Sequence, residues 1–366
     1  MIVRTCVGLA AALLAMVSLV AIVLDAQTGT QTSGTQTSGT QTSTQTNGAQ
    51  TSGTQTNAAS RAPYSPPRTP WGDPDLQGAF TNSDESLIPM ERPDALAGKT
   101  LDAISEAELA KLIEQRNLDR EEADRQRWEL RSPLHWFDNI NPKNSRAGMV
   151  TDPPDGKIPA QTAEARARAA GRAAARKGRG EADSWEDRSM FDRCISRSVP
   201  GSMMPAIYGN SYQIQQGPGY VAILYEMIHE ARVIPLGDQP HVAPSMRSYM
   251  GDARGRFEGN TLVVETRGFN EKIQYRGSSQ NLVLTERFTP VGPNTVEWSV
   301  TFNDPSTWVR PWTFGMHLTK VPDLEGPFEY ACHEGNYAMF NLLEAARAEE
   351  KVAAGAKPAA GAPQGR

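Results

Sequence analysis

The sequence contains little cysteine or histidine, with three cysteines and five histidines in 366 residues. It also has no excess of positive charge, because 37 Lys and Arg residues face 42 Asp and Glu residues, giving a net charge of −5. This balance argues against a general nucleic-acid binder, and a hydrophobic content of 39% argues against a polytopic membrane protein. We therefore expect no nucleic acid among the partners of this protein.

The sequence also lacks the motifs of the easily recognised enzyme classes. It has no GxSxG elbow, no GxGxxG after an expected strand, no P-loop, no HExxH and no EF-hand loop. Only enzymes without a sequence signature remain, and we expect no cofactor.

The N-terminal segment holds the longest apolar run. After Arg4 the chain is apolar from Cys6 to Leu24, and a polar tract follows. Residues 1–26 are therefore predicted to be an export signal or, if uncleaved, an anchor in which 6–24 spans the inner membrane. Both alternatives predict an exported protein, periplasmic or extracellular, whose only membrane contact would be this segment.

Composition divides the rest of the chain. Residues 27–60 repeat Gln, Thr, Ser and Gly and are predicted to be a disordered tether, and 346–366 a disordered tail, because neither has apolar side chains to bury. Residues 61–209 are expected to be extended and helical, and 210–345 to form the β domain. Within 61–209, residues 163–182 form an Arg- and Ala-rich excursion. This excursion is expected to be solvated and partly disordered, or alternatively to contact a membrane surface or polyanion.

Periodicity predicts a mainly β fold. A helix is expected from Asp102 to Arg131, where Ser105 and Glu108 form a capping box. Short Gly, Pro and Asn turns join the later strands and make them antiparallel. About nine such strands hide their edges by closing into an up-and-down barrel, with a β-sandwich as the alternative. The expected strands are 77–81, 211–216, 220–228, 231–236, 255–258, 261–266, 282–289, 295–303, 312–320 and 327–333.

Several blocks resemble a known family. They include PGSMMPAIYGNSYQ, YEMIHEARVIPL, GRFEGNTLVVET, DPSTWVRPWT and YACHEGNY. Over about Asp73 to Leu343 the chain resembles a family of exported, functionally uncharacterised proteins of soil bacteria. This resemblance implies that the protein is exported and related to that family, and it implies no activity. The expected barrel is also similar in outline to lipocalin-like folds, which implies no function.

Two cysteines remain outside the N-terminal segment, Cys194 and Cys332. We predict that they form a disulfide, because disulfides persist in exported proteins. The alternative is a free nucleophilic thiol at Cys332, beside His333.

Strand alternation suggests a pocket at one mouth of the barrel. Tyr225, Met227 and His229 share the inward face of one expected strand, and Tyr330 and Glu334 share a face of the last. His229 and Glu334 would be a general acid/base pair, and Tyr225, Met227 and Tyr330 would contact the ligand. The alternative is a strand-end histidine bonded to a backbone carbonyl and a glutamate on a solvated rim.

Arginines in the loops are further candidates. Arg254, Arg256 and Arg276 are placed to clamp a carboxylate or phosphate at a barrel mouth, or alternatively to form surface ion pairs. His229 and His333, together with Glu230 or Glu334, have the right chemistry for a metal site. No ligand spacing indicates one, and we expect no metal.

Three functions fit these observations. The first is an exported protein that binds a small apolar or amphipathic molecule in the barrel cavity. The alternative is a cofactor-free acid/base enzyme, a lyase, isomerase or hydrolase, that uses the same cavity. The third is a structural or surface-interaction protein. The sequence indicates no oligomeric state.

Overall fold

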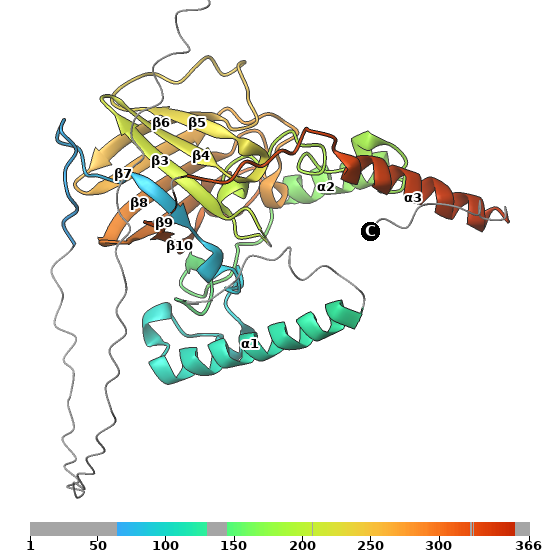
Figure 1. The fold of residues 1–366 in the computed structure, drawn as a ribbon, viewed down its shortest axis with the longest axis horizontal. Coiled ribbons are helices and arrows are strands. Elements are labelled where there is room, and N and C mark those ends of the chain that lie inside the picture. Colours follow the sequence, from blue (N-terminus) through green and yellow to red (C-terminus); the bar gives the residue numbers. More distant parts are fainter. Residues whose placement is uncertain (1–63, 130–144, 207, 323, 325, 356–366) are drawn as a thin grey trace, which may run out of the picture. The chain divides into compact units, whose positions relative to one another are not determined.

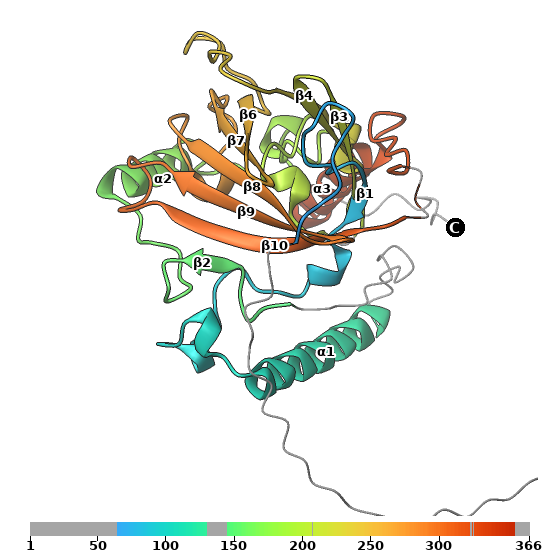
Figure 2. The ribbon, with the colours of Figure 1, turned by 90° about the vertical axis from the view of Figure 1, so that its left-hand side faces the viewer.

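Strands that alternate apolar and polar residues form one antiparallel sheet that curls into a nearly closed barrel (Figure 1, Figure 2). The fold comes from a computed structural model that describes residues 64–129, 145–206, 208–322, 324 and 326–355. The predictions for 1–26, 27–60 and 356–366 lie outside these residues. Among the described residues, no helix is both long and apolar enough to cross a membrane.

Nine strands follow one another round the barrel in the order β5-β4-β3-β1-β10-β9-β8-β7-β6, and the short β2 pairs with the first part of β10. Their bounds are β1 Gly78–Thr81, β2 Val150–Asp152, β3 Ser211–Gly217, β4 Tyr220–Tyr225, β5 Ala231–Pro235, β6 Asp252–Glu258, β7 Thr261–Arg267, β8 Val283–Gly292, β9 Thr295–Asn303 and β10 Trp312–Lys320. The predicted antiparallel barrel is confirmed, and the β-sandwich alternative is wrong.

The barrel closes between β5 and β6. When an odd number of strands alternate in direction around a ring, one pair of neighbouring strands must be parallel. Here that pair is β5 and β6, which the parallel bridge between Leu236 and Gly255 connects. The amide of Gly237 donates to the carbonyl of Gly255 at 3.0 Å. A Cβ atom on Gly255 would lie 2.8 Å from Leu236 Cδ2, so glycine allows the two edges to approach.

Two of the strand predictions fail. The strand expected over 220–228 ends at Tyr225, because Met227–His229 forms a 3-10 turn in which Ile228 and His229 have positive φ. The strand expected over 327–333 does not form. β10 already pairs with β9 and β1, so no edge is free beside it for the chain that follows.

Aromatic side chains fill the barrel interior. Phe302 and Trp312 stack with their ring centroids 4.2 Å apart, and Trp298 meets Phe314 edge to face at 5.5 Å. All four side chains are fully buried. Residues that face the interior alternate with residues that face outward, as in β9, where Val296, Trp298, Val300 and Phe302 are buried.

In the described part of the chain, three α-helices accompany the sheet: α1 Glu106–Glu129, α2 Ala163–Ala175 and α3 Tyr337–Ala353. The helix predicted around α1 is confirmed with its capping box, since the amide of Ser105 donates to Glu108 and the amide of Glu108 to Ser105. Short 3-10 helices occupy Ser83–Glu85, Asp94–Leu96, Leu101–Ala103, Trp185–Asp187, Gly201–Met203, Met227–His229 and Tyr275–Gly277.

Helices α2 and α3 correct two expectations of disorder. The excursion 163–182 begins with α2, which Thr162 caps and Arg168 anchors through hydrogen bonds to Ser306 and Thr307. An apolar face is therefore not needed to hold it. The tail expected to be disordered from 346 continues α3 to Ala353. There Arg347 donates to the carbonyl oxygens of residues 182 and 183.

Candidate functional site

A disulfide joins two chain segments at the end of the barrel where β3, β8 and β10 begin. Cys194 and Cys332 are bonded with their Cα atoms 5.6 Å apart, which confirms the predicted pair and excludes the free thiol. Arg197 follows Cys194 by three residues, and Tyr330 precedes Cys332 by two. The disulfide therefore brings the segments that carry these two side chains together.

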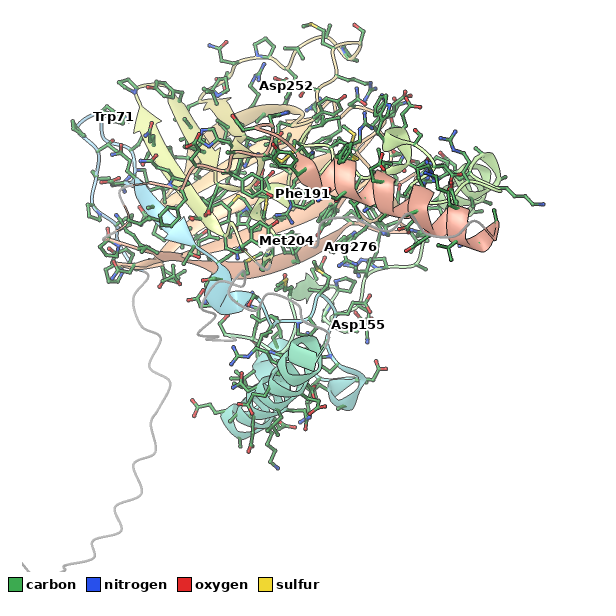
Figure 3. All side chains as sticks on the ribbon, turned by 45° about the vertical axis from the view of Figure 1, so that its right-hand side comes forward. Trp71, Asp155, Phe191, Met204, Asp252 and Arg276 are labelled. Atoms are coloured by element: carbon green, nitrogen blue, oxygen red, sulfur yellow. A yellow bond between two sulfur atoms is a disulfide. The ribbon has the colours of Figure 1, made fainter. Side chains whose placement is uncertain are left out.

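Arg197 is surrounded by tyrosines. Tyr208, Tyr212, Tyr275 and Tyr330 all lie close enough to interact electrostatically with its guanidinium group. The guanidinium group also lies 5.4 Å from the ring centroid of Phe191. We name Arg197, Tyr208, Tyr275, Arg276 and Tyr330 the Arg197 mouth, and Figure 3 labels Phe191, Met204 and Arg276 at this end.

The Arg197 guanidinium group has no carboxylate partner among the residues that the structure describes. Two carboxylates nearby bind other donors. Glu230 accepts the backbone amide of Arg197 at 3.0 Å and the hydroxyl of Ser202 at 3.3 Å. Glu226 accepts the amide and hydroxyl of Ser211. Burial lowers the pKa of Arg197, since its charge is removed from water without compensation.

The tyrosines of the mouth present both rings and hydroxyl groups. Tyr208 and Tyr330 stack with centroids 6.1 Å apart and planes at 18°. Burial, followed by hydrogen bonding with Tyr208, raises the pKa of Tyr330, so its hydroxyl is neutral and able to donate at neutral pH. Burial also raises the pKa of Tyr275, which stacks on Phe302 of the core at 5.4 Å. Arg197 therefore lies beside apolar ring surfaces and neutral hydroxyl donors.

Arg276 is the second arginine of the mouth. It is exposed, lies 5.9 Å from the centroid of Tyr275, and has a φ of 52°. A side chain other than glycine in this left-handed region costs about 1–3 kcal/mol, and such residues cluster at functional sites. No ion pair holds its guanidinium group within the described part of the chain.

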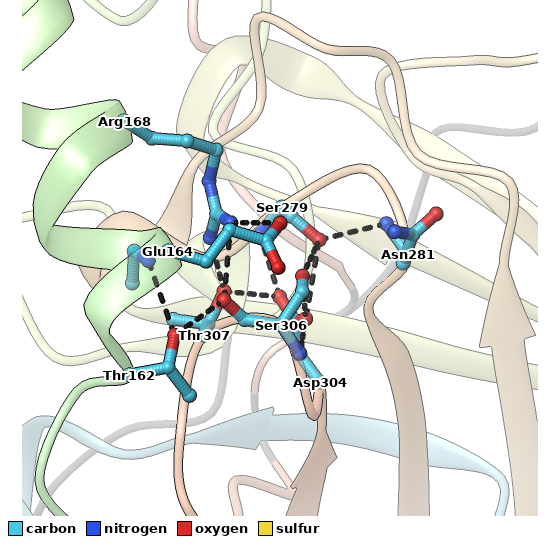
Figure 4. Close-up of polar contacts among 9 residues, drawn as sticks. Thr162, Glu164, Arg168, Ser279, Asn281, Asp304, Ser306 and Thr307 are labelled. Atoms are coloured by element: carbon cyan, nitrogen blue, oxygen red, sulfur yellow. Dashed lines mark hydrogen bonds and ion pairs between the residues drawn. The ribbon is translucent and has the colours of Figure 1, made fainter.

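A buried network fixes the segment that follows Arg276 (Figure 4). The carboxylate of Asp304 accepts the amide of Ser279 at 2.6 Å and the hydroxyl of Thr307 at 2.6 Å. Arg168 of α2 donates to the same Thr307 hydroxyl at 2.7 Å. The network links α2, the β9–β10 connection and the segment after Arg276, and so positions Tyr275 and Arg276.

Arg232 is not part of the Arg197 mouth and is buried in the barrel interior. It forms two hydrogen bonds with the carboxylate of Glu286, at 2.6 and 2.8 Å, and both side chains are almost fully buried. The indole N–H of Trp298 donates to the same carboxylate at 3.2 Å. This charge is compensated in place, in contrast to that of Arg197.

The structure separates the residues that strand alternation grouped together. Tyr225 is fully buried, meeting Tyr212 edge to face at 6.2 Å, and Met227 is buried against Gly209, beneath the mouth. Tyr330 lies in the mouth, as described above.

The proposed acid/base pair is not assembled. His229 and Glu334 are both exposed, and no hydrogen bond or ion pair joins them in the described structure. The 3-10 turn after Tyr225 breaks the strand that was expected to aim His229 inward. The segment expected to carry Glu334 inward is not a strand.

The arginines expected at a mouth divide into two groups. Arg254 forms an ion pair with Asp252 at 2.5 Å, and Arg256 pairs with Glu258 at 2.6 Å, both on β6. Only Arg276 reaches the mouth. Among the described residues, no group of three His, Cys, Asp or Glu side chains is placed to hold a metal ion.

Three residues of the mouth escaped the sequence analysis. Arg197, Tyr208 and Tyr275 lie in connections without strand or helix periodicity, where no pattern indicates which way a side chain points. The one available signal was the position of Arg197 three residues after a cysteine expected to be bridged.

Comparisons with known proteins yield one weak similarity. No family model and no curated protein matches the sequence, so the resemblance of its blocks to a soil-bacterial family stays a prediction. A solved structure of a secretory abundant heat soluble protein from Ramazzottius varieornatus is similar at 12% identity and a TM-score of 0.21. The match covers 36% of this chain and 87% of that one.

Proposed function

We propose that this protein binds a small amphipathic molecule through an anionic group, at the Arg197 mouth of its barrel. The observation that carries the proposal is the half-buried Arg197 guanidinium group, which has tyrosine neighbours but no carboxylate partner among the described residues. Charged groups withdrawn from water are normally paired, and an anionic ligand would supply the missing partner.

The surroundings of Arg197 indicate the rest of the ligand. The rings of Tyr208 and Tyr330 would pack against an apolar or aromatic body, while their hydroxyl groups would donate to the anion. Arg276 would supply a second cation. Because aromatic side chains fill the interior, the ligand is expected at the mouth and not deep in the barrel.

We further propose that the protein works outside the cytoplasm. The Cys194–Cys332 disulfide supports this location, since disulfides persist in oxidising compartments.

The first test uses anilinonaphthalene sulfonate, a fluorescent probe with an anionic group on an aromatic body. Titration of the full chain should show saturable binding, and Arg197→Gln should weaken it about tenfold or more, because a charge-assisted contact contributes about 1.5–3 kcal/mol. The matched control is Arg256→Gln, which removes an equal charge from the exposed Arg256–Glu258 pair and should leave the affinity unchanged.

A neutral analogue separates charge from apolar contact. N-phenylnaphthylamine has the same ring system without the sulfonate, and its affinity should not depend on Arg197. Equal sulfonate affinities for the Arg197→Gln and Arg256→Gln proteins would refute the proposal.

A further inference from the structure

A pocket of about 190 Å³ lies at the opposite end of the barrel, where β10 ends and β1 begins. One wall is the arm that leads into β1, and the other is the β8–β9 hairpin. The pocket shares no lining residue with the Arg197 mouth.

The walls of the pocket are mixed, with rigid apolar surface from four prolines and polar side chains beside them. Pro66 and Pro67 of the arm, Pro290 and Pro293 of the hairpin and Phe80 of β1 all line the pocket. Proline has a fixed φ and little conformational freedom to lose on binding.

Hydrogen bonds hold the arm in place. The amide of Leu76 donates to the side-chain oxygen of Gln216 at 2.6 Å, and the amide of Asp75 donates to the carbonyl of Pro67 at 2.9 Å. Arg68 donates to the side chain of Asn260 at 2.9 Å. The pocket is therefore formed before any ligand arrives.

Lys320 supplies one positive charge to this pocket. Its side chain crosses Gly78, where an added Cβ would lie 2.5 Å from Lys320 Cε, so the glycine leaves room for the lysine. Asp75 also lines the pocket, and its carboxylate accepts the amide of Gln77 at 2.9 Å and the side-chain amide of Gln77 at 3.3 Å. In the described part of the chain, the Lys320 ammonium group forms no ion pair.

We propose that this pocket is a second binding site, for a small monocarboxylate with a compact apolar or aromatic body. The carboxylate would pair with Lys320, and the body would pack between the prolines and Phe80. The volume limits the ligand to roughly a single ring, since a cavity of about 150 Å³ accommodates benzene. The site is independent of the function proposed for the Arg197 mouth.

The probe for this site is benzoate, with benzyl alcohol as its neutral counterpart. Titration of the full chain, followed by saturation-transfer NMR, should give saturable benzoate binding that Lys320→Met weakens about fivefold or more. Lys320→Arg retains the charge and should retain most of the affinity. Lys111→Met, on the exposed face of α1, should have no effect. Arg197→Gln removes any benzoate held at the Arg197 mouth, and the Lys320-dependent part of the binding should remain in this protein.

A blocking variant tests the same site without removing the charge. Thr295→Trp adds bulk at a lining residue and should also abolish benzoate binding. The β circular dichroism of each variant and the midpoint of its urea unfolding verify that it is folded. Unchanged affinity in folded Lys320→Met or Thr295→Trp protein, or loss of all benzoate binding in Arg197→Gln protein, would overturn the second site.

Discussion

At the scale of single residues, two arginines of this protein differ in how their charge is balanced. Arg232 has a bidentate carboxylate partner inside the barrel, while Arg197 has tyrosines and no carboxylate among the described residues. A paired internal charge is a feature of the fold, whereas an unpaired one at a mouth is available to a ligand. The contrast indicates a structural role for Arg232 and supports the binding role that we propose for Arg197.

The pairing of Arg232 is testable through stability. Arg232→Met leaves the Glu286 carboxylate buried without its cation and should lower the free energy of unfolding by about 3–5 kcal/mol in urea denaturation. The double variant Arg232→Met/Glu286→Leu should recover most of this loss. It should remain about 1–3 kcal/mol short, because the Trp298 indole N–H loses its acceptor. A double variant no more stable than the single one would show that the pair is not coupled.

At the scale of elements, the alternation of apolar and polar residues predicts a strand only where the chain stays in the hydrogen-bonded sheet. It located most of the barrel strands, because each buries one face and alternates. It failed for His229, because the positive φ values of Ile228 and His229 end the alternation, and neither residue is a glycine that would have signalled the turn. It also failed at 327–333, where β1 occupies the edge that a following strand would need.

The candidate site was harder to predict than the fold. The disulfide could be predicted, since only two cysteines remain outside the N-terminal segment. Tyr330 and Arg276 could be placed near a mouth. Arg197 and Tyr208 could not, because long-range contacts between irregular connections position them.

The polar network around Asp304 should make the connections at the mouth sensitive to acid. Burial acts to raise the pKa of Asp304, but hydrogen bonds from Thr307, Ser279 and Ser306 outweigh it and keep the pKa below its ordinary value of 3.8. A folded-state pKa below the unfolded one gives stability that is present above pH 3.8 and lost as the pH falls through the folded value.

Replacement of Asp304 by Asn should therefore cost about 2 kcal/mol at neutral pH and progressively less below pH 4. Urea unfolding of both proteins between pH 3 and pH 7 measures the difference. Asp238→Asn is the control, since Asp238 is an exposed carboxylate without a hydrogen bond or ion pair among the described residues. A constant difference between wild-type and Asp304→Asn protein across this range would contradict the assignment.

At the scale of the whole molecule, one covalent bond connects segments 138 residues apart in sequence and holds the two sides of the Arg197 mouth. The segment around Tyr330 belongs to no strand or helix. The disulfide attaches it near Arg197, together with the hydrogen bond from Asn336 to the Asp192 carbonyl. The barrel, by contrast, is held by its continuous ladder and by its interior.

Loss of the disulfide should therefore affect binding more than folding of the barrel. The free energy of unfolding of the Cys194→Ser/Cys332→Ser protein should be about 2–5 kcal/mol lower than that of the wild-type protein. The variant should retain the circular dichroism of a β protein. Its affinity for anilinonaphthalene sulfonate should fall toward that of Arg197→Gln, while benzoate binding at Lys320 persists. Full sulfonate affinity in the double-serine protein would show that the Tyr330 segment is not part of the site.

The most direct measurement for the central claim is native mass spectrometry of the protein purified from the organism that encodes it. The account predicts that wild-type and Arg256→Gln proteins carry a small molecule with an acidic group, released only on denaturation, and that Arg197→Gln protein carries none. An acidic ligand retained at equal occupancy by Arg197→Gln protein would contradict the claim that Arg197 binds the anion.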